Sequence, residues 1–368
     1  MKIDCNRAAL ANALGIVGSV VPSRTPRPIL QNVLLDATKE KAVLVGTDSE
    51  ISIRHDVSDV KCDRATSVLL PARRVGEVLR ELRDDRVTIF VEEKKLQLCG
   101  ERSKFNIPTE DVSGFPLSQT FKDCGYFTLP GNLLKTMIRR TVFATSIDTE
   151  RYAFTGVLFD PGEKLTLVGT DGRKLAMMTA PCVATGEPFS GGKLIVPAKA
   201  LSLLEKTIPD TQDVIHLAFT ANEVNFKTEH ATITSRLVEG NFPRYKDVVP
   251  RSHNVAVDLV AGPLQGVVRQ ALIFTSEESR GVDFELKSGY LRLTSQAADI
   301  GASEVELPIG FDGDSTIIRL DPRFLLEFLK TLPSESQINL KLIDEDSPAV
   351  IFTDDGSIYI IMPLAREV

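Results

Sequence analysis

An internal repeat constrains the fold of this chain more than any other feature of its sequence. The segment Leu167-Val168-Gly169-Thr170-Asp171 repeats the five residues Leu44-Val45-Gly46-Thr47-Asp48 at an offset of 123 residues. In the later copy alternating apolar residues lead into Asp171-Gly172, a pair that is typical of a β-hairpin turn. A repeat of this length predicts a duplicated domain rather than the short unit of a solenoid.

Helix starts recur at the same spacing. Pro71, Pro197 and Pro322 each open a stretch with helical spacing of apolar residues, and proline at a helix start loses no hydrogen bond. These stretches predict helices over residues 71–83, 197–209 and 321–332. Amphipathic helices are also expected over residues 6–16, 130–142 and 262–272, each followed by a strand-rich segment.

The spacing of these features predicts an α+β chain of three similar domains, each with two helices and antiparallel sheets. Phe115-Pro116 and Phe242-Pro243 add a further repeat near the ends of the first two copies. We expect domains at residues 1–124, 125–251 and 252–368, with boundaries near Cys124 and Arg251. The third copy is the most diverged, because Ser295-Gln296 stands where the other copies have Thr-Asp.

Composition indicates a globular protein outside the membrane. Hydrophobic residues make up 43% of the 368 residues, yet there is no run of 18 apolar residues. The apolar stretch 8–21 is interrupted by Asn12, so we expect a helix there rather than a signal sequence. Five scattered cysteines without a Cys-x-x-Cys pair favour reduced thiols and a cytoplasmic location: Cys5, Cys62, Cys99, Cys124 and Cys182.

We find no motif for catalysis, for a metal or for a cofactor. The histidines are far apart in the sequence and lack metal-ligand spacing: His55, His216, His230 and His253. Residues 169–174 resemble a phosphate loop in composition, but they lie between two expected strands and lack a following helix N-terminus. Asp84-Asp85 and Asp354-Asp355 stand in turn-like contexts. The sequence therefore predicts a binding or structural protein without catalytic residues or cofactors.

Charge is divided unevenly along the chain. The net charge is −7, but the six expected helices together carry an excess of Lys and Arg. Either helix surfaces simply hold basic residues, or the helices form a basic face that attracts phosphates without reading bases. Aromatic residues are 6% with no tryptophan, so base stacking on single strands is not favoured, and duplex DNA is the better fit.

Several short segments, taken in order, resemble one family over the full length of the chain. They are Met1-Lys2-Ile3, Arg24, Pro28–Asn32, Gly46–Asp48, Pro71–Arg73, Thr170–Ala176, Phe242-Pro243-x-Tyr245, Ser279–Val282 and Ile361–Leu364. The chain thus resembles the bacterial DNA polymerase III β subunit, the sliding clamp. The resemblance implies a head-to-tail homodimer that forms a six-domain ring, with helices lining the pore. It further implies a processivity factor that encircles double-stranded DNA and tethers the replicative polymerase, with a clamp loader and other motif-bearing proteins as partners.

The resemblance also implies three groups of site residues. DNA would be contacted by Arg24, Arg73, Tyr152 and Lys199. The dimer contact would join Arg74, Phe105 and Ile107 of one protomer to Ile273 and Phe274 of the other, although Phe105 and Ile107 could equally form a buried strand face. A partner-binding cleft would be lined by Phe154, Thr170, Gly172, Arg173, Lys174, Leu175, Pro243, Val248, Ile360, Met362, Pro363 and Leu364; the alternative is that most of these are core residues at a domain junction.

The chain departs from the family pattern at the cleft. Arg173-Lys174 stands where the family often has His-Arg, Asp247 stands where a basic residue is common, and the tail continues through residues 365–368. These differences leave the preferred partner motif open. Two other functional classes also stay open: an enzyme whose site is assembled from distant residues and acts on phosphorylated substrates, and a scaffold that uses the cleft without DNA.

Overall fold

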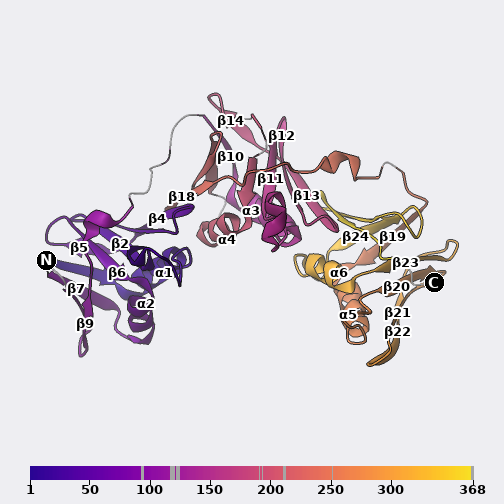
Figure 1. Cartoon of the computed structure of the whole chain (residues 1–368), viewed down its shortest axis with the longest axis horizontal. Coiled ribbons are helices and arrows are strands. Elements are labelled where there is room, and N and C mark those ends of the chain that lie inside the picture. Colours follow the sequence, from indigo (N-terminus) through magenta and orange to yellow (C-terminus); the bar gives the residue numbers. More distant parts are fainter. Residues whose placement is uncertain are drawn as a thin grey trace. The chain divides into compact units, whose positions relative to one another are not determined.

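The computed structural model describes residues 1–92, 95–116, 121, 125–189, 191–192, 194–209, 213–250 and 252–365. All six helices expected from the sequence are present, so the prediction of helices is confirmed (Figure 1). They are α1 (Arg7–Gly18), α2 (Ala72–Glu81), α3 (Gly131–Thr141), α4 (Ala198–Thr207), α5 (Ala261–Leu272) and α6 (Pro322–Leu329). Short 3-10 turns are η1 (Pro28–Gln31), η2 (Val112–Gly114), η3 (Val142–Ala144), η4 (Thr149–Phe154) and η5 (Tyr245–Asp247).

The strands form four sheets, and the pairings between neighbouring strands are antiparallel. A five-stranded sheet has the order β5 (Val60–Cys62), β1 (Lys2–Asn6), β7 (Arg86–Glu92), β8 (Lys95–Cys99), β9 (Lys104–Pro108). A nine-stranded sheet has the order β14 (Val183–Thr185), β10 (Tyr126–Pro130), β16 (Val214–Phe219), β17 (Glu223–Lys227), β18 (Ala231–Arg236), β4 (Ile51–Val57), β3 (Ala42–Thr47), β2 (Asn32–Ala37), β6 (Thr66–Pro71).

The other two sheets contain the remaining strands. An eight-stranded sheet has the order β15 (Leu194–Pro197), β11 (Gly156–Pro161), β12 (Lys164–Thr170), β13 (Lys174–Pro181), β26 (Ser357–Ile361), β25 (Ala349–Thr353), β24 (Gln337–Leu342), β19 (Val255–Val260). A four-stranded sheet has the order β22 (Gly301–Pro308), β21 (Tyr290–Ala297), β20 (Val282–Lys287), β23 (Thr316–Leu320). The hairpin predicted at Asp171-Gly172 joins β12 to β13.

The chain packs into two compact units. Unit 1 contains residues 1–135, 182–192 and 199–237, and unit 2 contains residues 136–181, 193–198 and 238–368. Each unit contains a sheet that continues across an expected domain boundary, because β18 pairs with β4 in unit 1 and β13 pairs with β26 in unit 2. The expected boundaries themselves, at Cys124 and Arg251, fall outside the described residues and stay predictions.

The glycine of the repeated segment lets a helix end lie directly on a strand. A Cβ atom at Gly46 would lie 2.7 Å from a side-chain carbon of Val17 in α1. A Cβ atom at Gly169 would lie 2.2 Å from the backbone oxygen of Thr141 in α3. In both copies, glycine thus permits the same close approach between the end of the first helix and the strand.

The Thr-Asp pair that follows the glycine closes the same turn in both copies. The Thr47 hydroxyl donates to the carbonyl of Ile51 at 2.9 Å, and the Asp48 carboxylate accepts from the Ile51 amide at 2.8 Å. In the second copy the Thr170 hydroxyl donates to the carbonyl of Lys174 at 2.7 Å, and Asp171 accepts from the Lys174 amide at 3.0 Å. Side-chain bonds of this kind favour turns over continued strands.

In the third copy, which has Ser295-Gln296 in place of Thr-Asp, the serine side chain bonds to the end of the helix. The Ser295 hydroxyl donates to the carbonyl of Ala271 near the end of α5, at 3.0 Å. The helix end is therefore held by a side-chain hydrogen bond rather than by close packing on glycine. In unit 2, α5 and α6 lie side by side (Figure 1), with α5 on β21 and β22 of the four-stranded sheet and α6 against β26 of the eight-stranded sheet. Their apolar faces join one core with residues such as Val268, Phe284 and Phe328.

A buried cation connects α3 to the last hairpin of unit 2. Arg140 is buried and pairs with the carboxylate of Asp355, at 2.8 Å, and with the backbone carbonyl of Thr331. Burial raises the pKa of Asp355, but hydrogen bonds from Thr353 and Ser357 and the charge of Arg140 outweigh burial and hold this pKa below its usual value. A buried guanidinium is costly without its partner, so this pair links two of the expected domains.

We expect Asp355→Asn to lower the free energy of unfolding by about 1.5 to 3 kcal/mol at neutral pH, since it removes the charge from a hydrogen-bonded partner of the buried Arg140. A carboxylate whose pKa is lowered by folding stabilises the fold above its unfolded pKa, and that stabilisation is lost as the pH falls. Acidification below the ordinary value of 3.8 should therefore destabilise the unsubstituted protein more than Asp355→Asn. Chemical denaturation as a function of pH tests this, with the neighbouring exposed Asp354→Asn as the control.

Candidate functional site

An apolar patch covers one face of the eight-stranded sheet in unit 2. Buried side chains from β11, β12, β13, β15, β25 and β26 meet residues of the segment 238–250 that crosses this face. We call this cluster the apolar patch; its buried members are Leu158, Val168, Leu175, Ile195, Val238, Phe242, Tyr245, Val350 and Ile360. Partly buried Ala153, Met177, Val249, Phe352 and Ile358 pack against it.

Several residues of the predicted cleft lie at or beside this patch. Leu175 and Ile360 belong to its buried floor, and the ring of Phe154 makes an edge-to-face contact with Phe242 at 6.4 Å between centroids. Val248 and Met362 are 37% and 41% exposed, which is high for large apolar side chains. The structure therefore brings a buried apolar floor together with exposed apolar residues.

The C-terminal segment is fixed by backbone hydrogen bonds. The Met362 amide donates to the carbonyl of Arg173 at 2.9 Å, and the Leu364 amide donates to the carbonyl of Arg319 at 2.8 Å. Because alternate residues of a strand share a face, Met362 continues the face to which Ile358 and Ile360 belong. Pro363 and Leu364 are half-buried, and the end of the tail, residues 366–368, lies outside the described part of the chain.

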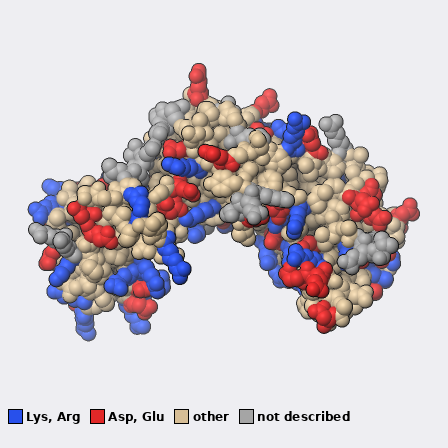
Figure 2. Space-filling model, viewed as in Figure 1, with Lys and Arg blue, Asp and Glu red and all other residues tan. Residues whose placement is uncertain are grey.

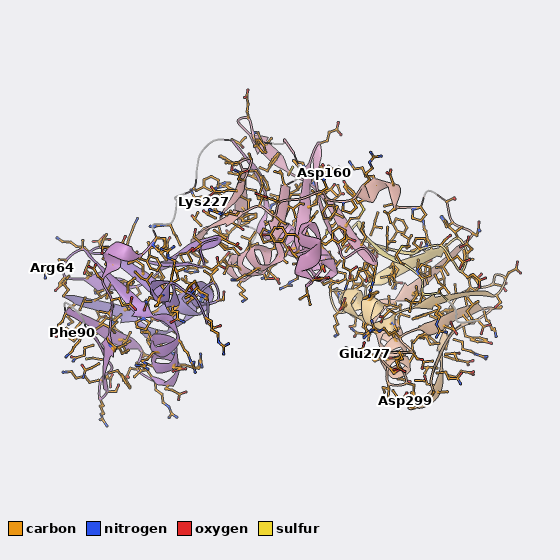
Figure 3. The ribbon with its side chains drawn as sticks, in the orientation of Figure 1. Arg64, Phe90, Asp160, Lys227, Glu277 and Asp299 are labelled. Atoms are coloured by element: carbon orange, nitrogen blue, oxygen red, sulfur yellow. The ribbon has the colours of Figure 1, made fainter. Side chains whose placement is uncertain are left out.

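A buried tyrosine anchors the segment that carries Pro243 and Val248. The Tyr245 hydroxyl donates to the carboxylate of Asp160 at 2.5 Å, and the Lys246 ammonium lies 3.1 Å from the same carboxylate. Burial raises the pKa of Tyr245, and the hydrogen bond to Asp160 raises it further. Asp160 lies near the end of β11 (Figure 3), so this strand holds η5 and the residues on either side of it.

Lys174 does not line the predicted cleft. Its side chain is 6% exposed and pairs with Glu327 of α6, and its ammonium lies 4.8 Å from the centroid of the Phe324 ring. Neighbouring residues of a strand point to opposite faces, so Leu175 reaches the apolar patch and Lys174 reaches the helix side. For Lys174 the prediction of a cleft contact is corrected to a structural ion pair. By contrast Thr170 is buried, and Gly172 and Arg173 are exposed at the turn.

Three of the residues predicted to contact DNA lie in unit 1. Arg24 is exposed in the loop after α1, Arg73 is exposed in α2, and Lys199 is half-exposed at the start of α4. Arg73 pairs with Glu77 at 3.0 Å, and Lys199 pairs with Asp48 at 2.5 Å. The Arg73–Glu77 pair is exposed and therefore weak, so a phosphate can replace this carboxylate, whereas Asp48 is only 14% exposed. In unit 2, Tyr152 is exposed within η4.

Lys and Arg side chains gather over α2 in unit 1 (Figure 2). Four exposed arginines lie on or directly after this helix: Arg73, Arg74, Arg80 and Arg83. Two acidic residues of the same segment, Glu77 and Glu81, are also exposed. The helix therefore presents a net positive surface, as the charge pattern of the sequence predicts.

The residues predicted for the dimer contact adjoin two sheet edges. Phe105 is half-buried on β9, the last strand of its sheet, and Ile273 is 66% exposed after α5. Phe274 lies against Gly301 at the start of β22, where a Cβ atom would lie 3.6 Å from its ring. Ile107 differs from the prediction, because its side chain is 3% exposed and thus already buried within unit 1. This residue follows the alternative of a buried strand face.

The structure brings together two histidines that are distant in the sequence. His55 on β4 lies opposite Ala231 of β18, and the carbonyl of the adjacent His230 accepts from the Asp56 amide at 2.9 Å. Burial lowers the pKa of His55. Within the described residues, no group of three or more His, Cys, Asp and Glu side chains has the geometry of a metal site. No helix in the same part of the chain has both the length and the apolar character to cross a membrane.

Comparison with known proteins gives one consistent result along the chain. Residues 1–119 match the DNA polymerase III beta subunit N-terminal domain, residues 128–244 its central domain, and residues 246–365 its C-terminal domain. The chain is 29% identical to the beta sliding clamp of Chlamydia pneumoniae over 366 residues, which covers 99% of each protein.

Solved structures agree with the family matches. The DNA polymerase III subunit beta of Pseudomonas aeruginosa is 28% identical, has a TM-score of 0.88, and each chain is covered completely. A sliding clamp of the same organism bound to griselimycin is 27% identical, with a TM-score of 0.90 over the whole of both chains. The three similar domains predicted from the internal repeats and the clamp fold implied by the resemblance are thus confirmed, and the chain belongs to the DNA polymerase III beta subunit family.

Proposed function

We propose that this protein is a DNA sliding clamp that encircles duplex DNA and tethers the replicative polymerase in the cytoplasm. The observation that carries this proposal is the match of all three domains, in order and over nearly the whole chain, to the DNA polymerase III beta subunit family. The hold on DNA would be topological, so the protein would perform no catalytic step and need no cofactor. Weak electrostatic contacts with phosphates would suffice, and Arg24, Arg73, Tyr152 and Lys199 are the proposed contacts.

The internal strand pairings support a ring made of two protomers. In the first join, β4, which follows Thr47-Asp48, pairs with β18, the last strand of the second copy. In the second join, β13, which follows Thr170-Asp171, pairs with β26, the last strand of the third copy. Both joins therefore pair the strand after the Thr-Asp turn of one copy with the last strand of the next copy.

The strand of the third copy that corresponds to β4 and β13 is β22, and the last strand of the first copy is β9. Each of these two strands lies at the edge of its sheet among the described strands. A bare sheet edge is a template for pairing with another chain. Exposed Arg102 and Lys104 lie on or near β9, and exposed Glu304 and Glu306 lie on β22, so the two edges have complementary charge. We propose that β22 of one protomer pairs with β9 of the other, since a head-to-tail contact closes when two copies complete the rotation.

The double substitution Ile273→Ala with Phe274→Ala is expected to convert the dimer into monomers, because both side chains lie next to the proposed edge contact. Loss of two large apolar side chains from an interface centre should weaken the dimer by about 100-fold or more. Sedimentation velocity over a dilution series measures this, with Val214→Ala, an exposed apolar residue of β16, as the control. A dimer of unchanged affinity would contradict the proposed interface.

The proposed partner site is the apolar patch with its exposed rim. An apolar surface that includes Met362 and Leu364 suits short partner segments, since flexible side chains repack around different ligands. The proposed partners are the replicative polymerase, the clamp loader and other proteins that carry clamp-binding segments. Arg173 and Asp247 are exposed near this surface and differ from the family pattern, so they would tune which segment binds.

Retention on circular DNA is the direct test of the function. The protein is loaded on nicked circular DNA by the organism's own clamp loader with ATP, transferred to high salt, and the DNA is then linearised. A topological link predicts retention on the circle and loss from the linear form. Equal, salt-sensitive binding to both forms, with an active loader, would indicate an ordinary DNA-binding surface and contradict the proposal.

A further inference from the structure

A cavity of about 150 Å³ opens in unit 2 at the end of the segment that crosses the apolar patch. Its walls come from the connection that leads into β19, from the end of β24, and from β25 with the turn before it. Residues that define it are Pro250, His253, Lys341, Pro348, Val350 and Phe352. None of these residues is among those predicted from the sequence for DNA, for the dimer contact or for the cleft, although Val350 and Phe352 also belong to the apolar patch.

The cavity and the apolar patch share two side chains. Val350 is a buried member of the patch, Phe352 packs against the patch, and both also line the cavity. In the sheet, Val350 lies opposite Lys341, which places the charged wall of the cavity on the strand next to the patch. The patch and the cavity therefore adjoin at Val350 and Phe352.

The chemistry of the walls favours an anion with an apolar stem. The Lys341 ammonium lies 4.6 Å from the centroid of the Phe352 ring and forms no ion pair with any carboxylate in the described chain. A cation held over an aromatic face in this way keeps its charge available. His253 is the other titratable side chain on the wall, and the remaining lining residues are Ser252 and residues with apolar side chains.

The nearest acidic turn is already engaged with its own backbone. Asp344 accepts hydrogen bonds from the amides of Asp346, at 3.1 Å, and Ser347, at 2.7 Å, and none of these three residues lines the cavity. The carboxylate of Asp344 is thus engaged within its own turn. The volume suits a single side chain, since a water molecule takes about 30 Å³ of liquid.

We propose that this cavity binds an aspartate or glutamate side chain of the partner segment whose apolar residues occupy the patch. The inference rests on the proposed function of the patch and adds a specificity element to it. Lys341 supplies the charge and the hydrogen bond to the carboxylate, and Val350 and Phe352 pack against the aliphatic part of the side chain. Partners with an acidic residue at the matching distance are selected over partners with a neutral or basic one.

Fluorescence anisotropy with labelled peptides tests this inference. The probe is the amidated C-terminal segment of the organism's replicative polymerase, unextended or extended at either end by Gly-Ser-Glu or by Gly-Ser-Gln. We expect the glutamate extension at one end to bind about fivefold more tightly than the glutamine extension, as for one charge-assisted hydrogen bond. This advantage should disappear in Lys341→Gln, persist in Lys341→Arg, and persist in the control Lys330→Gln on the helix side.

Equal binding of the glutamate and glutamine peptides at both ends would overturn the inference, and so would a glutamate advantage that survives Lys341→Gln. Binding of the unextended peptide shows whether the cavity assignment alone is wrong or whether the patch is not the partner site. If Met362→Ala with Leu364→Ala abolishes binding of the unextended peptide while glutamate confers no advantage, only the cavity assignment is wrong. If that double variant binds the unextended peptide normally, the patch is not the partner site and both proposals fail.

Discussion

Replacement of Gly169 by alanine is expected to lower the free energy of unfolding by about 3 kcal/mol. The added Cβ atom would lie 2.2 Å from the backbone oxygen of Thr141, and a backbone atom at the end of α3 cannot move aside as a side chain can. The strand β12 and the helix end must therefore separate, which disturbs the core between them. Differential scanning calorimetry and chemical denaturation measure the loss.

A second glycine provides the matched control. Gly15 lies within α1, and a Cβ atom there would have no neighbour within 4 Å, so Gly15→Ala should stabilise the protein by about 0.5 to 1 kcal/mol. Gly46→Ala should fall between the two, since its nearest contacts, a Val17 side-chain carbon at 2.7 Å and the Val17 backbone oxygen at 3.0 Å, are less severe than the 2.2 Å contact at Gly169. A neutral Gly169→Ala would show that the close approach of helix and strand is not required.

Met362→Ala with Leu364→Ala is expected to reduce the affinity for a polymerase tail peptide by about 100-fold or more while the dimer stays intact. Met362 is 41% exposed and Leu364 is half-buried, so both are available to a ligand and neither is part of the central core. Anchor residues of this kind carry most of the energy in small interfaces. Anisotropy with a labelled peptide measures affinity, and sedimentation measures the oligomeric state.

The comparison for this variant is Val183→Ala, which removes an exposed apolar side chain, 65% exposed, from β14 in unit 1. Its peptide affinity should not change. Backbone hydrogen bonds from Met362 and Leu364 to Arg173 and Arg319 are retained when the side chains are shortened, so the segment should keep its path. Unchanged peptide affinity in the double variant would remove the assignment of the partner site.

Local signals in the sequence predict the helices well. Pro71, Pro197 and Pro322 place three helix starts within a residue or two of their observed positions, because proline both permits a first turn and fixes its backbone angle. The Thr-Asp repeat likewise predicts the turn before β13. These features depend on neighbours along the chain, so the chain alone is sufficient to predict them.

The joins between sheets could not be predicted in the same way. Nothing in the composition of β18 indicates that its partner is β4, about 180 residues away, because strand pairing depends on registry and on edges that only the folded chain defines. The expected second domain is consequently divided between the two compact units.

The contacts of individual residues in the candidate site could not be predicted from the sequence either. Lys174 and Leu175 are adjacent in the motif, yet one reaches α6 and the other reaches the apolar patch, since neighbouring strand residues point to opposite faces. Tyr245 belongs to a motif of the sequence, but its anchor Asp160 lies in a distant strand and carries no sequence signal. The wall of the cavity likewise comes from segments far apart in the chain.

The repeated use of β4 with β18 and of β13 with β26 has a consequence for ring opening. Both of these joins connect strands of one polypeptide, so each strand meets its partner at an effective concentration of about millimolar or higher. A join between β22 and β9 of separate protomers uses the same elements but forms only at the actual protein concentration. Dilution of the protein would therefore weaken the proposed join between protomers but not the two joins within each chain. The ring would open at the join between protomers.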